Sequence, residues 1–154
     1  MSSPEQAYLE IIKTGGKTTE AEATKIFDQL KPIEPSFLMG EWEGGDFNTG
    51  HPASESLKKL NWVGKTFRTE NDVDPIMVRG EGGERTFLEM YGHAQVREVK
   101  FRGVVSAAMV YDTRPIIDHF RYVDEETVAG MMDVKDAPAG YHFHLTRLRT
   151  GSKM

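Results

Sequence analysis

One strand-like stretch of the sequence places an ionisable residue among apolar ones, an arrangement that can support proton transfer. In IIDHFRYVD, Asp118 shares an alternating face with Ile116 and Phe120. If that face points inward, burial raises the pKa of the Asp118 carboxyl toward the range of a general acid or base. We therefore predict Asp118 as a catalytic residue. The alternative is a structural ion pair with Arg102 or Arg121.

Two further residues are candidates for the same chemistry. Lys65, in WVGKTFRT, lies between two apolar residues on one strand face, and alternation places Trp62 on the opposite face. The Lys65 ammonium either reaches into a cavity, where it would stabilise developing negative charge, or extends to the surface. His51, in the turn TGHP, is either a proton-transfer group at a pocket mouth or an exposed loop residue. We predict both as catalytic residues, and we expect Gly44-Gly45 to end a strand so that DFNTGHP forms a loop carrying His51.

The strand GVVSAAMVYD supplies candidates for binding a ligand. Its small residues leave internal volume, and the hydroxyl of Tyr111 at its end would orient a ligand there. The alternative is tight packing of this strand against N-terminal helices. Met109, Met131 and Met132 suit either an adaptable apolar wall or an ordinary core. We predict Tyr111 and Met132 as ligand-binding residues.

The pair His142 and His144 in YHFHL resembles part of a metal or haem site. In a strand, both imidazoles point to the same face and could hold a metal together. The apolar residues around them favour the alternative, a solvent-facing or hydrogen-bonded pair. The glycine-rich runs lack the spacing of phosphate-binding motifs, and the sequence contains no cysteine. We therefore expect no cofactor and no metal.

Periodicity and turn residues divide the chain into two N-terminal helices followed by short strands. Helices are predicted over 4–13 and 19–30, the second with a capping box at Thr19 and Glu22, and a short helix over 54–60. Strands are predicted over 36–43, 62–69, 75–79, 85–91, 95–102, 104–111, 115–123, 127–133 and 141–149. Such closely spaced strands predict a mainly β protein, an antiparallel barrel of about eight to ten strands that can enclose one small ligand.

Length and composition are typical of one globular domain. In the 154 residues we expect a helical segment over 1–32 packed on the barrel, the barrel over 33–149 and a tail over 150–154. Basic residues are not clustered and the net charge is −5, so we expect no nucleic-acid partner. The absence of cysteine and of a long apolar run predicts a cytoplasmic protein without membrane contact. The terminal Ser152-Lys153-Met154 resembles a peroxisomal address.

Two segments of the sequence resemble a known family. Gly40-Glu41-Trp42-Glu43-Gly44, followed by Thr49-Gly50-His51-Pro52, Trp62 and Gly64-Lys65, resembles the GXWXG family. FRGVVSAAMVYDTRPIIDHFRYVDEETVAGMMDVK resembles the companion domain of unknown function that follows it. The resemblance implies one structural unit from about Leu30 to the end. Carried onto this chain, the family pattern covers the candidates above and adds the following ligand-binding candidates: Trp62, Arg102, Phe120 and Asp133.

The Gly-x-Trp element also looks like the first strand of lipocalins and of haem-carrying nitrobindins. This resemblance implies a lipocalin-like or calycin-like barrel in which Trp42 closes one end. An arginine of the final strand, Arg147 or Arg149, would stack on its indole. Trp42 is therefore another candidate for the ligand site, and haem binding through His144 or His142 stays open as an alternative.

We predict that the barrel binds a mostly apolar small molecule and acts on it by cofactor-independent acid/base chemistry, as an isomerase, cyclase or dehydratase. Asp118 or His51 would transfer the proton. Lys65 or Arg102 would stabilise negative charge, and Tyr111 would orient the substrate. The alternatives are a non-catalytic carrier or sensor with the same pocket, and haem binding. Whether the chain is a monomer or a homodimer stays open.

Overall fold

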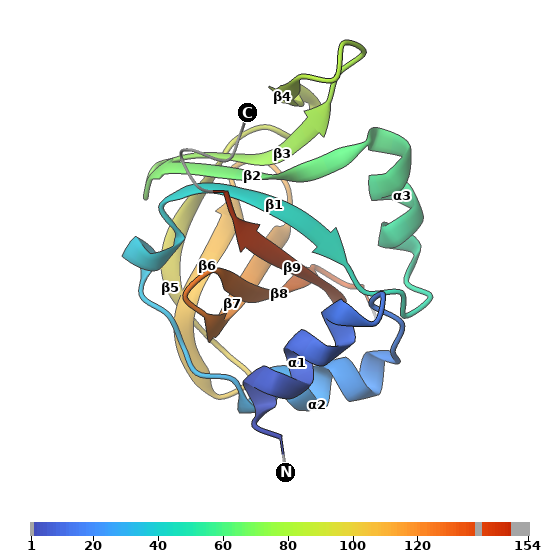
Figure 1. Ribbon diagram of the computed structural model, residues 1–154. Helices are drawn as coiled ribbons and strands as arrows, with labels where there is room; N and C mark the ends of the chain where they lie inside the picture. Colours follow the sequence, from blue (N-terminus) through green and yellow to red (C-terminus); the bar gives the residue numbers. More distant parts are fainter. Residues whose placement is uncertain (1, 138–139, 149–154) are drawn as a thin grey trace.

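A barrel of strands forms the centre of the fold, with helices on two of its sides (Figure 1). The computed structural model describes residues 2–137 and 140–148. Its helices are α1 (Pro4–Lys13), α2 (Glu20–Gln29) and α3 (Pro52–Leu60), with two 3-10 turns, η1 (Pro35–Leu38) and η2 (Glu89–Tyr91). Its strands are β1 (Gly40–Asp46), β2 (Trp62–Thr69), β3 (Asp72–Arg79), β4 (Arg85–Phe87), β5 (Ala94–Phe101), β6 (Val104–Tyr111), β7 (Ile116–Asp124), β8 (Thr127–Val134) and β9 (Tyr141–Arg147). None of these helices has the length and apolar character needed to cross a membrane.

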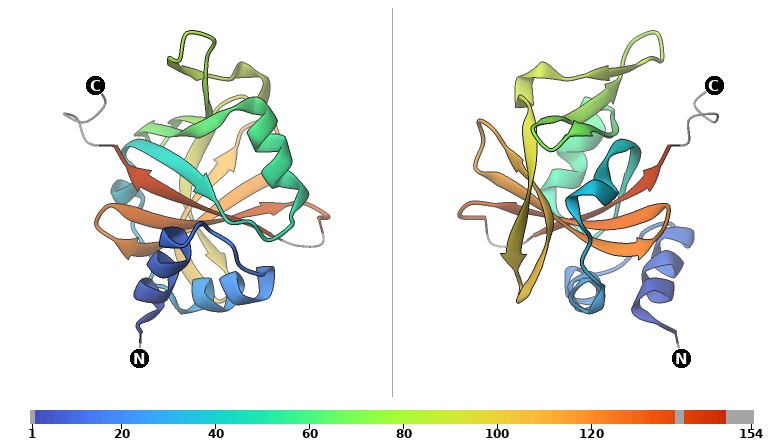
Figure 2. Two further views of the ribbon diagram at one scale, coloured as in Figure 1. Left: turned by 45° about the vertical axis from the view of Figure 1, so that its right-hand side comes forward. Right: turned by 90° about the vertical axis from the view of Figure 1, so that its left-hand side faces the viewer.

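The described strands form one antiparallel sheet that closes on itself. Neighbours follow the order β2-β1-β9-β8-β7-β6-β5-β3, and pairing of β2 with β3 completes an eight-stranded barrel. β4 pairs with β3, and this hairpin extends away from the barrel (Figures 1 and 2). β1 pairs with β9 along its length, whereas β3 and β5 meet at one pair, Val73 with Ala94. The predicted antiparallel, lipocalin-like barrel is confirmed.

Apolar side chains fill most of the barrel interior. The rings of Phe67, Phe120 and Phe143 are buried there, and Phe120 packs edge-on against the other two. A second core lies between the helices α1 and α2 and the outer surface of the barrel, and it includes Tyr8 and Phe27. Because both faces of several strands are therefore buried, the sequence of those strands does not show a simple alternation of polar and apolar residues.

Trp42 is held between the barrel interior and an arginine. Its indole Nε1 donates to the Leu38 carbonyl at 2.7 Å, and the Arg147 guanidinium lies 4.3 Å from the ring centre. A cation-π contact of this kind contributes about 1 kcal/mol. The predicted stacking is confirmed for Arg147, whereas Arg149 and the terminal residues 152–154 lie outside the described part of the chain.

Arg121 joins α2 to the barrel from the outer side of β7. Its guanidinium donates to the carbonyls of Phe27 and Leu30, at 2.9 and 3.1 Å, and to that of Phe101 at 3.3 Å. The last carbonyls of a helix lack donors within the helix, so this buried side chain satisfies them. The alternative in which Arg121 pairs with Asp118 is therefore wrong.

Several strand boundaries differ from those predicted, and β3 begins at Asp72 instead of residue 75. Residues 35–38 form a 3-10 turn, so β1 begins at Gly40 instead of residue 36. In place of a strand over 85–91, β4 ends at Phe87 and a second 3-10 turn follows. Proline at residue 35 is the first residue of that 3-10 turn, a position that suits its fixed φ, which is one physical reason for the later start of β1.

Gly44 and Gly45 also behave differently from the prediction, because β1 continues through them to Asp46. A side chain at Gly44 would collide with the ring of Trp62, and one at Gly45 with the ring of His144. These glycines therefore allow two rings to pack directly on the backbone of β1, one on each face, rather than ending the strand.

Replacing Gly44 by alanine is expected to lower the free energy of unfolding by about 1–3 kcal/mol, because the new methyl group overlaps the partly buried Trp62 ring. Gly82→Ala is the matched control. There the new methyl group meets only the flexible carboxylate of Glu84 at 3.0 Å, so a change below about 0.5 kcal/mol is expected. Urea titration measures both, and equal effects of the two substitutions would contradict the packing argument.

Candidate functional site

A cavity of about 210 Å³ lies between α3 and the barrel interior. An apolar cavity of about 150 Å³ holds benzene, so this one has room for a ligand of about ten non-hydrogen atoms. Most of its walls are aromatic or aliphatic. The lining residues come from α3, from η2 and from six strands: Ala53, Ser56, Leu57, Trp62, Lys65, Ile76, Tyr91, Tyr111, Ile116, Asp118, Met132, Tyr141 and Phe143.

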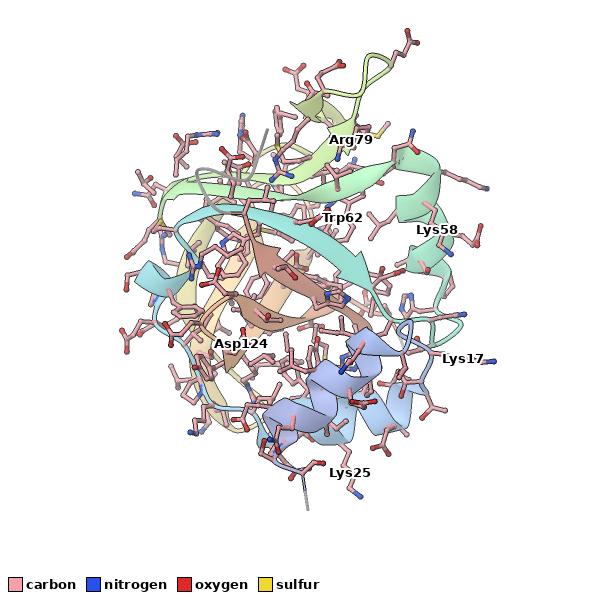
Figure 3. All side chains as sticks on the ribbon, viewed as in Figure 1. Lys17, Lys25, Lys58, Trp62, Arg79 and Asp124 are labelled. Carbon is pink, nitrogen blue, oxygen red and sulfur yellow. The ribbon has the colours of Figure 1, made fainter. Side chains whose placement is uncertain are left out.

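A buried ion pair joins two strands at the wall of this cavity. Lys65 Nζ on β2 lies 3.0 Å from Asp118 Oδ2 on β7, and both side chains are 3% exposed or less. Lys65 Nζ also donates to the Pro75 carbonyl at 3.1 Å. Lys17, Lys25 and Lys58 extend outward into solvent (Figure 3), whereas Lys65 is enclosed. The sequence left open whether Lys65 reaches the surface or the interior, and the structure places it inside.

Three aromatic rings surround the Lys65 ammonium. Nζ lies 5.3, 5.6 and 5.9 Å from the ring centres of Phe143, Trp62 and Tyr111. The negative faces of such rings stabilise a cation that has lost its water. The ammonium is therefore held by one carboxylate, one carbonyl and an aromatic enclosure.

Asp118 carries the polar atom of most chemical interest in this cavity. Burial raises the pKa of its carboxyl above the usual range, and the Lys65 ammonium opposes that rise. Oδ2 contacts Lys65, but Oδ1 is buried and has no hydrogen-bond partner among the described residues. A buried acceptor without a donor costs about 1–3 kcal/mol. Oδ1 can therefore gain substantially from a ligand that donates a hydrogen bond or a proton.

Tyr111 places a phenol on the same cavity wall. Its hydroxyl makes no hydrogen bond with the residues that the structure describes. Burial, and then the Asp118 charge, raise its pKa well above the ordinary value. Tyr111 therefore stays protonated and acts as a hydrogen-bond donor. Tyr141, which the sequence did not single out, instead donates to Asp46 Oδ2 at 2.7 Å, and the same oxygen accepts from Ser54 Oγ on α3.

Trp62 and Lys65 both line the cavity, although a regular strand would place them on opposite faces. The pairing of β2 with β3 shifts register between Trp62 and Gly64, and again between Gly64 and Thr66. Gly64 has φ +152°, a conformation that residues with side chains rarely adopt. A glycine inside a strand is a recognised sign of a bulge, so Gly64 was the sequence signal for this arrangement.

His51 lies beside the site rather than on its wall. It is the residue before α3, where its Nδ1 accepts from the Ala53 N–H at 3.0 Å, and its ring centre lies 5.4 Å from that of Tyr141. This accepting role places the neutral imidazole proton on Nε2. His51 therefore fixes the start of the helix that covers the cavity.

Four predicted ligand-binding residues lie away from the cavity wall. Trp42 and Phe120 are buried in the core beside it. Arg102, in the turn between β5 and β6, forms an ion pair with Asp28 at the end of α2. Asp133 lies on the outer face of β8, 3.3 Å from His119 Nε2. Arg102 therefore does not reach the cavity to stabilise charge there, and Arg102 is not the partner of Asp118.

The predicted pair His142 and His144 lies on the outer face of β9 rather than in the cavity. His142 is fully buried beneath α2, with Nε2 2.9 Å from Thr24 Oγ1. It is thus a hydrogen-bonded core residue, not a solvent-facing one. Since neither imidazole points to the cavity, the geometry gives no support to haem held in the barrel by these residues.

One group of side chains outside the cavity has metal-binding residue types: Asp72, Asp74 and His93. The Arg68 guanidinium already forms ion pairs with both carboxylates, at 3.1 and 2.8 Å. A positive group therefore already offsets part of the charge of the two acids. This cluster is best explained as a surface ion-pair network.

The fold and site define a closed antiparallel barrel with a small, largely aromatic cavity, compatible with binding a small molecule. Residues 25–83 match the family described as GXWXG protein, and residues 92–147 match a domain of unknown function (DUF4334). The crystal structure of a protein from Thermomonospora curvata is similar, with 41% identity and a TM-score of 0.93 over 96% of this chain and 100% of that chain. A comparison with curated proteins finds no match. The chain therefore belongs to the GXWXG family.

Proposed function

We propose that this protein binds a mostly apolar small molecule in the barrel cavity and acts on it by cofactor-independent acid/base chemistry, of the isomerase, cyclase or dehydratase type. The observation that carries this proposal is the Asp118 carboxylate, buried on the cavity wall with one oxygen that accepts no hydrogen bond from the described residues. Replacing a buried ion pair by apolar residues is often neutral or stabilising. The Lys65–Asp118 pair is thus better explained by chemistry in the cavity than by stability.

Each of four residues has a role in the proposed reaction. Asp118 Oδ1 takes a proton from the substrate or returns one, since its raised pKa brings it closer to neutral pH. Lys65 favours the charged form of that carboxylate. Tyr111 donates a hydrogen bond to the substrate. His51 holds α3 in position, and the cavity-facing side chains of α3 complete the apolar enclosure.

The test compares wild type with Asp118→Asn on a panel of neutral compounds of about ten non-hydrogen atoms: cyclic ketones, allylic alcohols and epoxides. Binding is followed by the fluorescence of Trp62, and products by gas chromatography. We expect turnover by the wild type and a loss of at least about 100-fold in Asp118→Asn, with binding retained. Asp112→Asn, an exposed carboxylate at the end of β6, is the matched control and should keep full activity.

Two other outcomes are informative. A ligand that binds wild type but remains unchanged after long incubation, across the whole panel, would identify a non-catalytic carrier or sensor. If no compound binds, the proposed use of the cavity is wrong.

A further inference from the structure

We propose that the substrate is a neutral ketone or aldehyde of about ten non-hydrogen atoms, and that Asp118 moves a proton on the carbon next to its carbonyl group. This inference rests on the proposed function and adds the chemical class of the substrate. It follows from three properties of the cavity: its charge balance, its surplus of hydrogen-bond donors, and the poor acidity of those donors.

The charge balance of the cavity favours a neutral ligand. Among the described lining residues, Lys65 and Asp118 carry the charges, one of each sign and 3.0 Å apart. A ligand carboxylate or phosphate would meet the free Oδ1 of Asp118, and a ligand ammonium would meet the Lys65 ammonium. Next to buried charged groups such like-charge contacts cost several kcal/mol. A ligand without charge avoids both.

The hydrogen-bonding groups that remain free favour a carbonyl oxygen. Lys65 uses two of its three N–H groups on Pro75 and Asp118. The Tyr111 hydroxyl and the indole Nε1 of Trp62 have no partner among the described residues. The free donors therefore outnumber the one free carboxylate oxygen. A carbonyl oxygen accepts two hydrogen bonds and donates none, so it matches this set better than an alcohol does.

The acidity of these hydrogen-bond donors decides between two kinds of reaction, the loss of a hydroxyl group and the formation of an enolate. Loss of a hydroxyl group needs an acid that gives up its proton to the leaving oxygen. Tyr111 is a poor acid for this step, because burial and the Asp118 charge raise its pKa well above 10. Stabilising an enolate requires only a hydrogen bond to the developing oxyanion, which a protonated tyrosine supplies.

The proposed step balances without a further reactant. Asp118 Oδ1 removes a proton from the α-carbon, and the electrons of that C–H bond form a carbon–carbon double bond. The electrons of the carbonyl π bond move to oxygen, where Tyr111 and the free Lys65 N–H stabilise the charge. The protonated Asp118 then returns the proton to the same carbon or to a conjugated one, or it first exchanges that proton with water, which then supplies the proton that is returned. The net result is exchange, epimerisation or double-bond migration.

The experiment uses 4-isopropylcyclohexanone, which has about ten non-hydrogen atoms and four exchangeable α-hydrogens. The purified full chain and the ketone are incubated in D₂O, and deuterium at the α-carbon is measured by mass spectrometry. We expect exchange at least about 100-fold above that in buffer, and its loss in Asp118→Asn. Because that variant leaves Lys65 without its carboxylate, Tyr111→Phe is the second variant. It keeps the ion pair and should slow exchange by about 10-fold.

Matched ligands separate failure of this inference from failure of the proposed function. The corresponding alcohol, carboxylate and ammonium compounds carry the same isopropylcyclohexyl group, and the two charged ones should bind at least about 10-fold more weakly than the ketone. Ketone binding without deuterium exchange would overturn the carbonyl assignment while leaving the cavity as a binding site. Conversion of the alcohol without exchange of the ketone would also overturn it and would favour dehydration. If none of the four binds, the proposed function fails as well.

Discussion

Replacing Lys65 by methionine is expected to lower the free energy of unfolding by about 3–5 kcal/mol at pH 7, the cost of leaving one partner of a buried ion pair behind. Methionine fills a similar volume, so the loss comes from the Asp118 carboxylate rather than from a cavity. Asp118 then lies among aromatic rings with no cation within contact distance. Equilibrium urea unfolding, followed by far-ultraviolet circular dichroism, measures this change.

The double variant Lys65→Met/Asp118→Leu is the control for that prediction. With both charges removed, the free energy of unfolding should return to within about 1 kcal/mol of wild type, although activity should be lost. The effect of the single variant should also shrink at low pH. The pKa of Asp118 is raised in the folded state. At a pH low enough to protonate this carboxyl in both the folded and the unfolded chain, the variant buries no charge and is not destabilised by it. The destabilisation then grows as the pH rises. Equal destabilisation of the single and double variants would show that packing, not charge, is responsible.

Acidification from pH 7 to pH 4.5 is expected to lower the free energy of unfolding by about 2 kcal/mol for each of His142 and His144. Burial lowers the pKa of both to about 4, against an ordinary value of 6.5. Between these two values the unfolded chain binds protons that the folded chain does not. Stability contributed by the neutral imidazoles is therefore fully present above about pH 6.5 and is lost as the pH falls.

The hydrogen bonds around His142 explain why it resists protonation. Thr24 Oγ1 donates to Glu20 Oε2, so its remaining contact with His142 Nε2 must be one in which the imidazole donates. His142 Nδ1 is buried without a partner in the part of the chain that the structure describes, and a second proton there would find no acceptor among those residues. Burial away from water has the largest effect on the pKa of His142, and it lowers that pKa. Among the smaller effects, the negative charges of Glu20 and Asp28 favour the charged imidazole. Arg102 and His51 disfavour it.

The Nδ1 of His144 is also buried without a partner, next to the ring of Phe47, and Asp46 is the carboxylate that favours its charged form. The control for the acid prediction is the double variant His142→Gln/His144→Gln. Glutamine retains an N–H for Thr24 but does not titrate, so the double variant should lose about 4 kcal/mol of the pH dependence. What remains measures the titratable groups common to both proteins, which are the carboxylates and the other histidines, including the buried His119. If the free energy of unfolding of the double variant depends on pH between 4.5 and 7 as strongly as that of wild type, the prediction is contradicted.

The barrel was predictable because its signals are local. Turn residues and short apolar runs mark most of the strands, and the caps and apolar spacing of α1 and α2 define those helices closely. The prediction of secondary structure was wrong where one local sequence pattern is compatible with two structures. Gly44-Gly45 reads as a strand break in the sequence, but the glycines are required by rings from β2 and β9 that pack on β1. That requirement depends on contacts from other strands, which no local pattern reveals.

The site was predictable only in part, because ion pairing across a barrel depends on how strands align. Alternation placed Asp118 on one face with Ile116 and Phe120, but it did not decide whether that face points inward, and the partner of Asp118 could not be chosen among several basic residues. Lys65 became the partner through the bulges around Gly64, which also turned Trp62 inward. The cavity-facing side chains of α3 were missed, although Ala53 and Leu57 have the i, i+4 spacing of one helical face.

The Lys65–Asp118 pair joins the two sequence segments that match different family descriptions, since Lys65 belongs to residues 25–83 and Asp118 to residues 92–147. β1 of the first segment also pairs along its length with β9 of the second. Neither segment can close the ring of strands alone, and each would leave one buried charge uncompensated. We therefore expect the two to be inherited and folded as one unit. A chain divided in the exposed turn at residues 80–83 would behave as a complementing fragment system, in which structure returns when the two pieces are mixed.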